Sequence, residues 1–192
     1  FDYVWKHTSL DLPPRYLFSA FWEGQEGSFL LWMFWNAILG WILTYTAKNF
    51  EGPVVGVFAA VQAFLVSMIL GIWIGDYQIG YSPFNLVREL PENLGLPWTQ
   101  FEDYLTRFPN FMDGSGLNPL LQNYWMTIHP PTLFLGFAST LIPFSYAIAG
   151  LLRKDYTSWI SSALKWSVFS VGILGVGILM GGAWAYEALS FG

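Results

Sequence analysis

The sequence predicts an all-α, polytopic integral membrane protein with about four transmembrane helices. Charged residues make up only 11% of the 192 residues, whereas soluble domains carry about 25%, so this chain cannot cover a water-facing surface in the usual way. A further 20% are aromatic, including eleven tryptophans, and Trp and Tyr concentrate where a bilayer meets water. Four long stretches without Asp, Glu, Lys, Arg or His complete the pattern.

These four stretches are each long enough to cross a bilayer. A helix rises about 1.5 Å per residue, so about 20 apolar residues cross a hydrocarbon core of roughly 30 Å. Lipid offers no hydrogen-bond partners to the backbone, which makes helices the expected conformation. Together they form one membrane domain over residues 1–192, with predicted spans at residues 27–47, 52–75, 130–152 and 166–186.

Two features within the spans concern helix packing. Pro143 removes a backbone donor from the third span and is expected to kink it. Two pairs of glycines lie four residues apart, Gly71 with Gly75 and Gly177 with Gly181. Such pairs let helix backbones approach closely, so both are predicted to lie at helix–helix contacts.

Basic residues in the short connections predict the orientation. The connection between spans one and two and the connection between spans three and four carry Lys48, Arg153, Lys154 and Lys165. The positive-inside bias assigns both connections to the cytoplasm. The opposite side then holds residues 1–26, the segment 76–129 and the end of the chain after Tyr186.

The outer loop at residues 76–129 is too long to be a simple connection. Phe101, Tyr104, Leu105 and Phe108 fall at helical spacing, which predicts a short amphipathic helix over residues 97–108. We interpret this loop as a lid that rests on the bilayer surface rather than as a separate catalytic domain.

Composition argues against several classes of function. The net charge is −5 and basic residues are not clustered, which argues against nucleic acid as a partner. The chain has no cysteine, and so no thiolate metal site or disulfide framework of its own. No predicted span contains a histidine, so this segment by itself cannot hold a haem inside the bilayer between two imidazoles.

His129 is the most informative candidate for chemistry. It directly precedes Pro130 and Pro131, and proline suits the first turn of a helix, where its missing N–H costs nothing. His129 is therefore predicted at the N-terminal junction of the third span, with its imidazole facing outward. The residues alone leave two interpretations open, a histidine satisfied by water or a carbonyl, and a metal ligand.

Two further stretches at the outer boundary have both structural and functional interpretations. Gly24, Glu26 and Gly27 precede the first span, where an acid suits the positive end of the helix dipole. Trp184 and Tyr186 end the fourth span, and they form either an aromatic belt or one wall of a site for a flat ligand.

The same stretches resemble the CcmF-type cytochrome c haem lyases. The segments that carry the resemblance are residues 19–32 (SAFWEGQEGSFLLW), 116–137 (GLNPLLQNYWMTIHPPTLFLGF) and 181–187 (GGAWAYE). Their order and spacing match the family over essentially the whole chain. The residues that the resemblance places at the site are Trp22, Gly24, Glu26, Gly27, Asn118, Pro119, His129, Pro130, Pro131, Trp184 and Tyr186.

The resemblance implies a haem-handling function. It assigns His129 as an axial ligand of haem iron, and Trp22, Trp184 and Tyr186 as aromatic groups along the haem face. The haem would be held at the outer face of the bacterial inner membrane, toward the periplasm, for attachment to the CxxCH motif of apocytochrome c. The implied partners are a haem-delivering chaperone, apocytochrome c, other cytochrome c maturation membrane proteins and membrane lipid.

The chain also departs from the family pattern. It stops at Gly192, where the tryptophan-rich haem-binding segment is expected to begin, and so it is expected to be one part of a lyase that is not sufficient for catalysis alone. The stretch at residues 92–112 is longer than expected for the family. His7 matches a position that is often histidine in the family, and no role is assigned to it.

Two other functions are open alternatives. A transporter segment would carry ionisable groups within its spans, whereas these spans hold only the uncharged Asn36 and Gln62. A non-catalytic structural subunit of a respiratory complex would use the aromatic residues and glycines only for packing.

Overall fold

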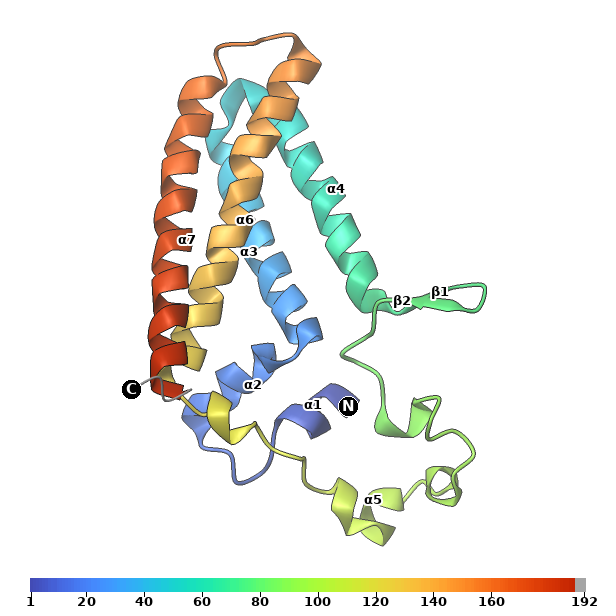
Figure 1. The fold of residues 1–192 in the computed structure, drawn as a ribbon. Coiled ribbons are helices and arrows are strands. Elements are labelled where there is room, and N and C mark those ends of the chain that lie inside the picture. Colours follow the sequence, from blue (N-terminus) through green and yellow to red (C-terminus); the bar gives the residue numbers. More distant parts are fainter. Residues whose placement is uncertain (189–192) are drawn as a thin grey trace.

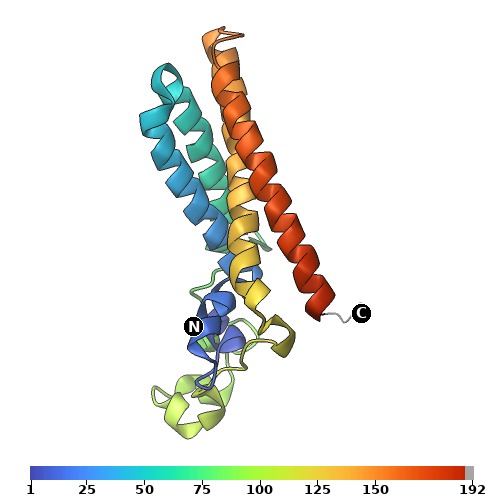
Figure 2. The same ribbon diagram turned by 90° about the vertical axis from the view of Figure 1, so that its left-hand side faces the viewer.

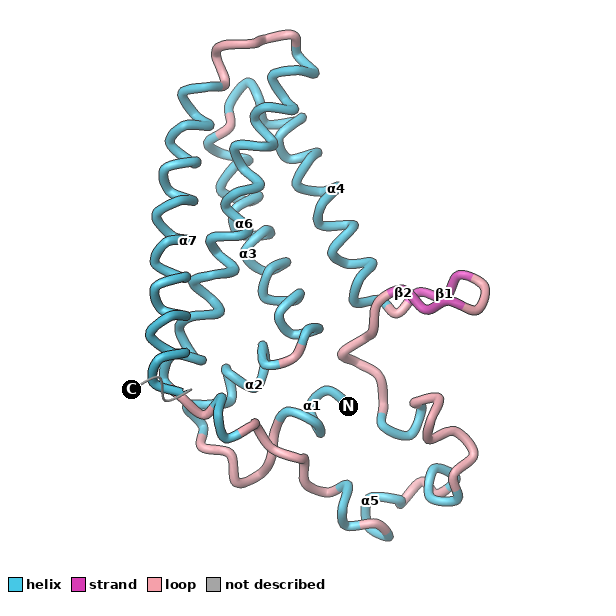
Figure 3. The backbone as a smooth tube through the Cα atoms, in the orientation of Figure 1, coloured by secondary structure: helices cyan, strands magenta, loops and turns pink. Residues whose placement is uncertain are grey.

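Four long helices form the body of the protein. The structure is a computed structural model that describes residues 1–188, and Figure 1 shows how its helices are arranged. Each of the four is long and apolar enough to cross a membrane, which confirms the predicted all-α, polytopic fold class. The connections α3–α4 and α6–α7 lie at one end of the bundle. The N-terminus, the last turn of α7, the short helices and the long loop lie at the other end (Figures 1 and 3).

The membrane helices are α3 Gln25–Thr46, α4 Glu51–Leu70, α6 Tyr124–Arg153 and α7 Ile160–Ala188. Two short helices precede them, α1 Asp2–His7 and α2 Leu17–Glu23, and a third in the outer loop is α5 Tyr104–Arg107. The only sheet in residues 1–188 is an antiparallel hairpin of β1 Ile72–Ile74 and β2 Tyr77–Ile79. Single 3-10 turns are Pro14–Tyr16, Lys48–Phe50, Val87–Glu89, Pro97–Gln100, Pro109–Phe111 and Pro119–Leu121.

Helix α6 is the centre of the bundle. It packs against α3, α4 and α7, and Figure 2 shows it between the α3–α4 pair and α7. Leu43, Ile142 and Tyr146 are fully buried in the shared core. Most of the surface of α7 instead faces away from the other helices. Only 11% of the most apolar 18-residue stretch of α7 is buried, against 44% of the corresponding stretch of α6.

The second span is shorter than predicted. Helix α4 ends at Leu70 because Gly71 adopts the left-handed backbone conformation, with φ of 65°, which commonly ends an α-helix. The apolar residues that follow, Ile72–Ile74, form an exposed strand. Gly75 lies in the hairpin turn with φ of 61°, so the prediction that Gly71 and Gly75 pack one helix against another is wrong.

The third span begins earlier than predicted. Helix α6 starts at Tyr124, where the Oδ1 of Asn123 accepts a hydrogen bond from the backbone N–H of Trp125 at 2.9 Å. His129 and the two following prolines therefore lie in the second turn of the helix rather than at its N-terminal junction. The outer loop also differs, because the predicted helix over residues 97–108 divides into a 3-10 turn at Pro97–Gln100 and helix α5.

Charge is divided unevenly between the two ends of the bundle. The end with the short connections carries four basic residues and two acids, which are Lys48, Arg153, Lys154, Lys165, Glu51 and Asp155. The other end carries the remaining eleven acids and four basic residues. The four basic residues from which the orientation was predicted thus lie at the same end of the bundle, and the orientation stays a prediction.

Helix α1 docks on the corner between α2 and α3. The Tyr3 hydroxyl donates to the carbonyl of Phe21 at 2.9 Å and accepts from the Gly24 N–H at 3.0 Å. Burial raises the pKa of Tyr3 to about 12, so this phenol stays protonated at neutral pH. The Nδ1 of His7 lies 2.8 Å from a carboxylate oxygen of Glu23, which gives His7 a structural contact.

Candidate functional site

The candidate site lies where α6 and α7 come into close contact, near the end of the bundle that holds the long loop. Glycines make this contact possible, because a Cβ on Gly177 would lie 3.1 Å from the Cα of Leu133, and one on Gly136 would lie 2.7 Å from Leu174. A Cβ on Gly181 would lie 2.8 Å from the imidazole of His129. The predicted role of Gly177 and Gly181 in close helix packing is therefore confirmed.

The imidazole of His129 bridges the two helices. Its Nδ1 lies 2.8 Å from the backbone carbonyl oxygen of Gly177 on α7. A carbonyl oxygen can only accept, so Nδ1 carries the proton and donates it, and the lone pair of the neutral ring is on Nε2. Within residues 1–188, Nε2 makes no hydrogen bond. This is the arrangement in which a second contact fixes the tautomer and orientation of a metal-binding histidine.

The position of His129 differs from the sequence prediction in one respect. The sequence predicts an imidazole that faces outward from the N-terminal junction of the third span. In the structure, the side chain is half-buried and directed at α7. The reason is the early start of α6 at Tyr124, which places His129 more than a full turn inside the helix.

Trp184 lies beside His129. Its ring centroid is 6.3 Å from that of the imidazole, and the two ring planes are inclined by only 28°. The indole Nε1 is buried and has no hydrogen-bond partner within residues 1–188. Trp184 also lines an apolar cavity of about 180 Å³ together with Asn118, Leu120 and Leu121 of the outer loop. The predicted residues His129, Trp184 and Asn118 thus belong to one region.

The two prolines that follow His129 free backbone carbonyls in α6. Proline has no N–H, so the carbonyls of Met126 and Thr127, four residues before Pro130 and Pro131, lose their helical partners. The indole Nε1 of Trp22 donates to the Met126 carbonyl at 2.9 Å, and this bond is buried. Pro130 therefore frees the Met126 carbonyl, which accepts from Trp22 and fixes α2 against α6.

Two other predicted residues, Trp22 and Tyr186, do not line the cavity beside Trp184. Trp22 is buried beside Leu31 and Met126. Tyr186 follows Trp184 by two residues, about 200° around the helix, and is 61% exposed. Asn118 caps the 3-10 turn that starts at Pro119, where its Oδ1 accepts from the Leu120 N–H at 3.0 Å.

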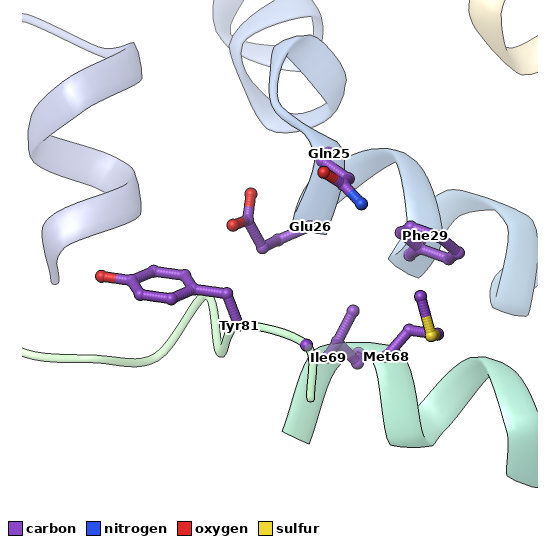
Figure 4. A pocket seen from close by; sticks show the side chains of 7 residues that line it. Gln25, Glu26, Phe29, Met68, Ile69 and Tyr81 are labelled. Atoms are coloured by element: carbon purple, nitrogen blue, oxygen red, sulfur yellow. The ribbon is translucent and has the colours of Figure 1, made fainter. Parts of the chain in front are cut away.

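The stretch from Gly24 to Gly27 has a packing role. A Cβ on Gly24 would lie 2.7 Å from the ring of Tyr3, and one on Gly27 would overlap the carbonyl oxygen of Phe21. Glu26 lines a separate cavity of about 200 Å³ between the start of α3, the end of α4 and the loop around Tyr81 (Figure 4).

Sequence reasoning missed the two backbone carbonyls that organise this region. The Met126 carbonyl could have been found, because any proline within a helix frees the carbonyl four residues earlier. The Gly177 carbonyl could not, since its contact with His129 depends on the register between α6 and α7.

Replacing Gly181 with alanine is expected to displace the imidazole. The new methyl group would lie 2.8 Å from Cε1 and 3.2 Å from Nε2 of His129, closer than van der Waals contact, so the ring must turn and its bond to Gly177 weakens. We expect a loss of about 1 kcal/mol in stability and a changed ¹⁵N chemical shift of the histidine Nδ1. Gly182→Ala is the matched control, because nothing lies within 4 Å of its Cβ. Equal imidazole spectra for the two variants would contradict this geometry.

Comparisons with known proteins identify the family. A family model described as "Cytochrome C assembly protein" matches residues 22–191. The cytochrome c-type biogenesis protein CcmF of Pseudomonas fluorescens is 32% identical over 99% of this chain and 26% of that protein. CcmF of Escherichia coli (strain K12) gives the same identity and coverage. The cytochrome c-type biogenesis protein NrfE of Haemophilus influenzae is 27% identical over 100% of this chain and 26% of that protein.

The chain spans about a quarter of the length of these relatives. No solved structure matches it at a significant level. Because the family model covers residues 22–191, nearly all of the sequence, the chain belongs to the cytochrome C assembly protein family.

Proposed function

We propose that this chain is part of a membrane haem lyase of cytochrome c maturation, in which His129 binds haem iron at the outer end of the bundle. The observation that carries the proposal is the hydrogen bond from His129 Nδ1 to the Gly177 carbonyl. It holds the ring in the tautomer whose Nε2 can bind a metal.

The residues around His129 suit a haem. One imidazole is the only ligand that a protein needs to supply on one side of a haem iron, because the porphyrin supplies the four equatorial nitrogens. Gly181 lets α7 pack directly against the imidazole, because a side chain at that position would collide with the ring. Trp184 adds an aromatic ring inclined by 28° to the imidazole, and such rings pack well on conjugated surfaces.

The contribution of this chain would be position and orientation. When bound, haem supplies the vinyl groups, and apocytochrome c supplies the cysteine thiols of its CxxCH motif, so the protein itself needs no nucleophile. His129 would fix the iron, and the α6–α7 contact would fix His129. A haem-delivering chaperone, apocytochrome c and other maturation membrane proteins are the proposed partners.

We place this site on the periplasmic side of the bacterial inner membrane. The support is the concentration of Lys48, Arg153, Lys154 and Lys165 at the opposite end, because basic connections favour the cytoplasm. The relatives that match the chain are bacterial proteins, in agreement with this location.

Haem titration of the complete protein tests the proposal. We expect His129→Ala to weaken haem binding roughly ten-fold or more and to shift the absorption bands of the residual complex, because one axial ligand is lost. Free imidazole at millimolar concentration should restore the original bands by taking the vacated ligand position.

His7→Ala is the matched control, since His7 is the only other histidine in the chain and contacts Glu23 rather than α7. We expect the His7→Ala complex to keep the bands of the unmodified protein. Identical haem affinity and spectra for His129→Ala and the unmodified protein would remove the ligand role of His129.

A further inference from the structure

A second site lies at the opposite end of the bundle from His129. There, a cavity of about 560 Å³ opens between the α3–α4 connection and the first turns of α7. Figure 1 draws this end of the bundle at the top. Its lining combines two lysines, five hydroxyl groups and an amide with apolar aromatic rings. The polar lining residues are Tyr45, Thr46, Lys48, Asn49, Tyr146, Ser158, Ser162 and Lys165.

Among residues 1–188, neither of the two lysines, Lys48 and Lys165, forms an ion pair. The nearby carboxylate of Asp155 is already engaged, since it accepts from the backbone N–H groups of Thr157 at 3.2 Å and Ser158 at 3.0 Å and from the Ser158 hydroxyl. The cavity therefore presents two ammonium groups that form no ion pair among residues 1–188, beside hydroxyl and amide groups.

The aromatic lining gives the cavity a membrane-facing side. Tyr45 and Trp166 both line it. Trp41 lies one turn along α3 from Tyr45, with ring centroids 5.9 Å apart, and Phe169 follows Trp166 on α7 at 5.6 Å. These apolar rings continue from the polar cavity toward the middle of the bundle, which is the direction that acyl chains take from a headgroup.

We propose that this cavity binds the phosphate headgroup of an anionic phospholipid between Lys48 and Lys165. The cavity lies at the ends of membrane-spanning helices, at the level where headgroups are found. Basic pockets between helices at such a level suit phosphate-bearing lipids. A zwitterionic lipid would bring its own ammonium group against two lysines and is disfavoured. The hydroxyl groups and the Asn49 amide can serve the polar remainder of a glycerol headgroup.

The backbone allows a clean removal of charge. Lys48 has a left-handed conformation with φ of 50°, which asparagine tolerates better than most residues, so Lys48→Asn removes the charge without straining the turn. Lys165 lies in regular helix, where Lys165→Gln is suitable. Lys154→Asn is the matched control, because Lys154 is also left-handed, with φ of 55°, lies at the same end of the bundle, and does not line the cavity.

Native mass spectrometry of the complete protein in detergent with added phosphatidylglycerol or phosphatidylcholine tests the proposal. We expect phosphatidylglycerol to be retained in preference to phosphatidylcholine. Each lysine substitution should weaken that retention about five-fold, and the double variant roughly 25-fold, while Lys154→Asn should have little effect. An excess of inorganic phosphate should not displace the lipid.

Three outcomes would overturn the proposal. Equal retention of the two lipids would remove the preference for an anionic headgroup, and full retention by the Lys48→Asn, Lys165→Gln double variant would remove the site. Displacement by inorganic phosphate would show that the cavity binds free phosphate rather than a lipid.

Discussion

Replacing Gly27 with alanine is expected to destabilise the corner between α2 and α3 by about 3 kcal/mol. The added Cβ would overlap the carbonyl oxygen of Phe21 and the hydroxyl of Tyr3, and would lie 2.8 Å from the carbonyl carbon of Phe21. A backbone carbonyl cannot move aside cheaply, so the corner between α2 and α3 must open. Helix α1, which docks there through Tyr3, should detach. The measurement is the unfolding midpoint of the purified protein as the fraction of a denaturing detergent is increased.

Gly56→Ala provides the control for the change of residue type. Gly56 lies in the membrane helix α4, and nothing lies within 4 Å of its Cβ position. Alanine there should leave the midpoint unchanged or raise it slightly, because alanine favours the helix more than glycine does. If Gly27→Ala and Gly56→Ala unfold at the same midpoint, the close packing described at the α2–α3 corner is wrong.

Trp22→Phe is expected to cost about 2 kcal/mol by removing a single buried hydrogen bond. Phenylalanine keeps most of the apolar contact with Leu31 and Met126 but has no N–H to donate. The Met126 carbonyl would then be buried without a partner, since Pro130 cannot supply one, and an unsatisfied buried carbonyl costs about 1–3 kcal/mol. The same detergent-unfolding measurement reports the loss.

A double-mutant cycle isolates the contribution of the proline. Pro130→Ala restores a backbone N–H that can bond the Met126 carbonyl within α6, so in that background Trp22→Phe should lose much of its effect. Pro131→Ala is the matched control, because it restores a partner for Thr127 and leaves the Met126 carbonyl free. We expect a coupling of about 1–2 kcal/mol with Pro130 and close to zero with Pro131. Equal coupling with both prolines would refute the role assigned to Pro130.

The sequence predicted the number and order of the membrane helices well, because insertion depends on length and on the absence of charge. It did not predict where the helices end. Residues 72–74 are as apolar as the helix before them, and only the left-handed conformation of Gly71 separates the two. Helix α6 begins directly after its polar cap, Asn123, more than one turn before the predicted start of the span. A search for apolar stretches does not detect such a cap.

The sequence predicted residues of the candidate site but not how they are arranged in space. The resemblance identified His129 and Trp184, which the structure brings together. It also grouped with them Tyr186 and Glu26, which lie on other surfaces. Helical spacing alone separates Trp184 from Tyr186. The contact between His129 and Gly177 depends on how two helices align, and a single sequence carries no such information.

Because the imidazole of His129 on α6 is hydrogen-bonded to the Gly177 carbonyl on α7, its direction depends on the positions of both helices. A shift of α7 along α6 by a single residue, about 1.5 Å, would carry the carbonyl away and let the ring rotate. Any partner that binds the exposed surface of α7 and displaces it would thereby turn the imidazole, with no contact to the histidine itself.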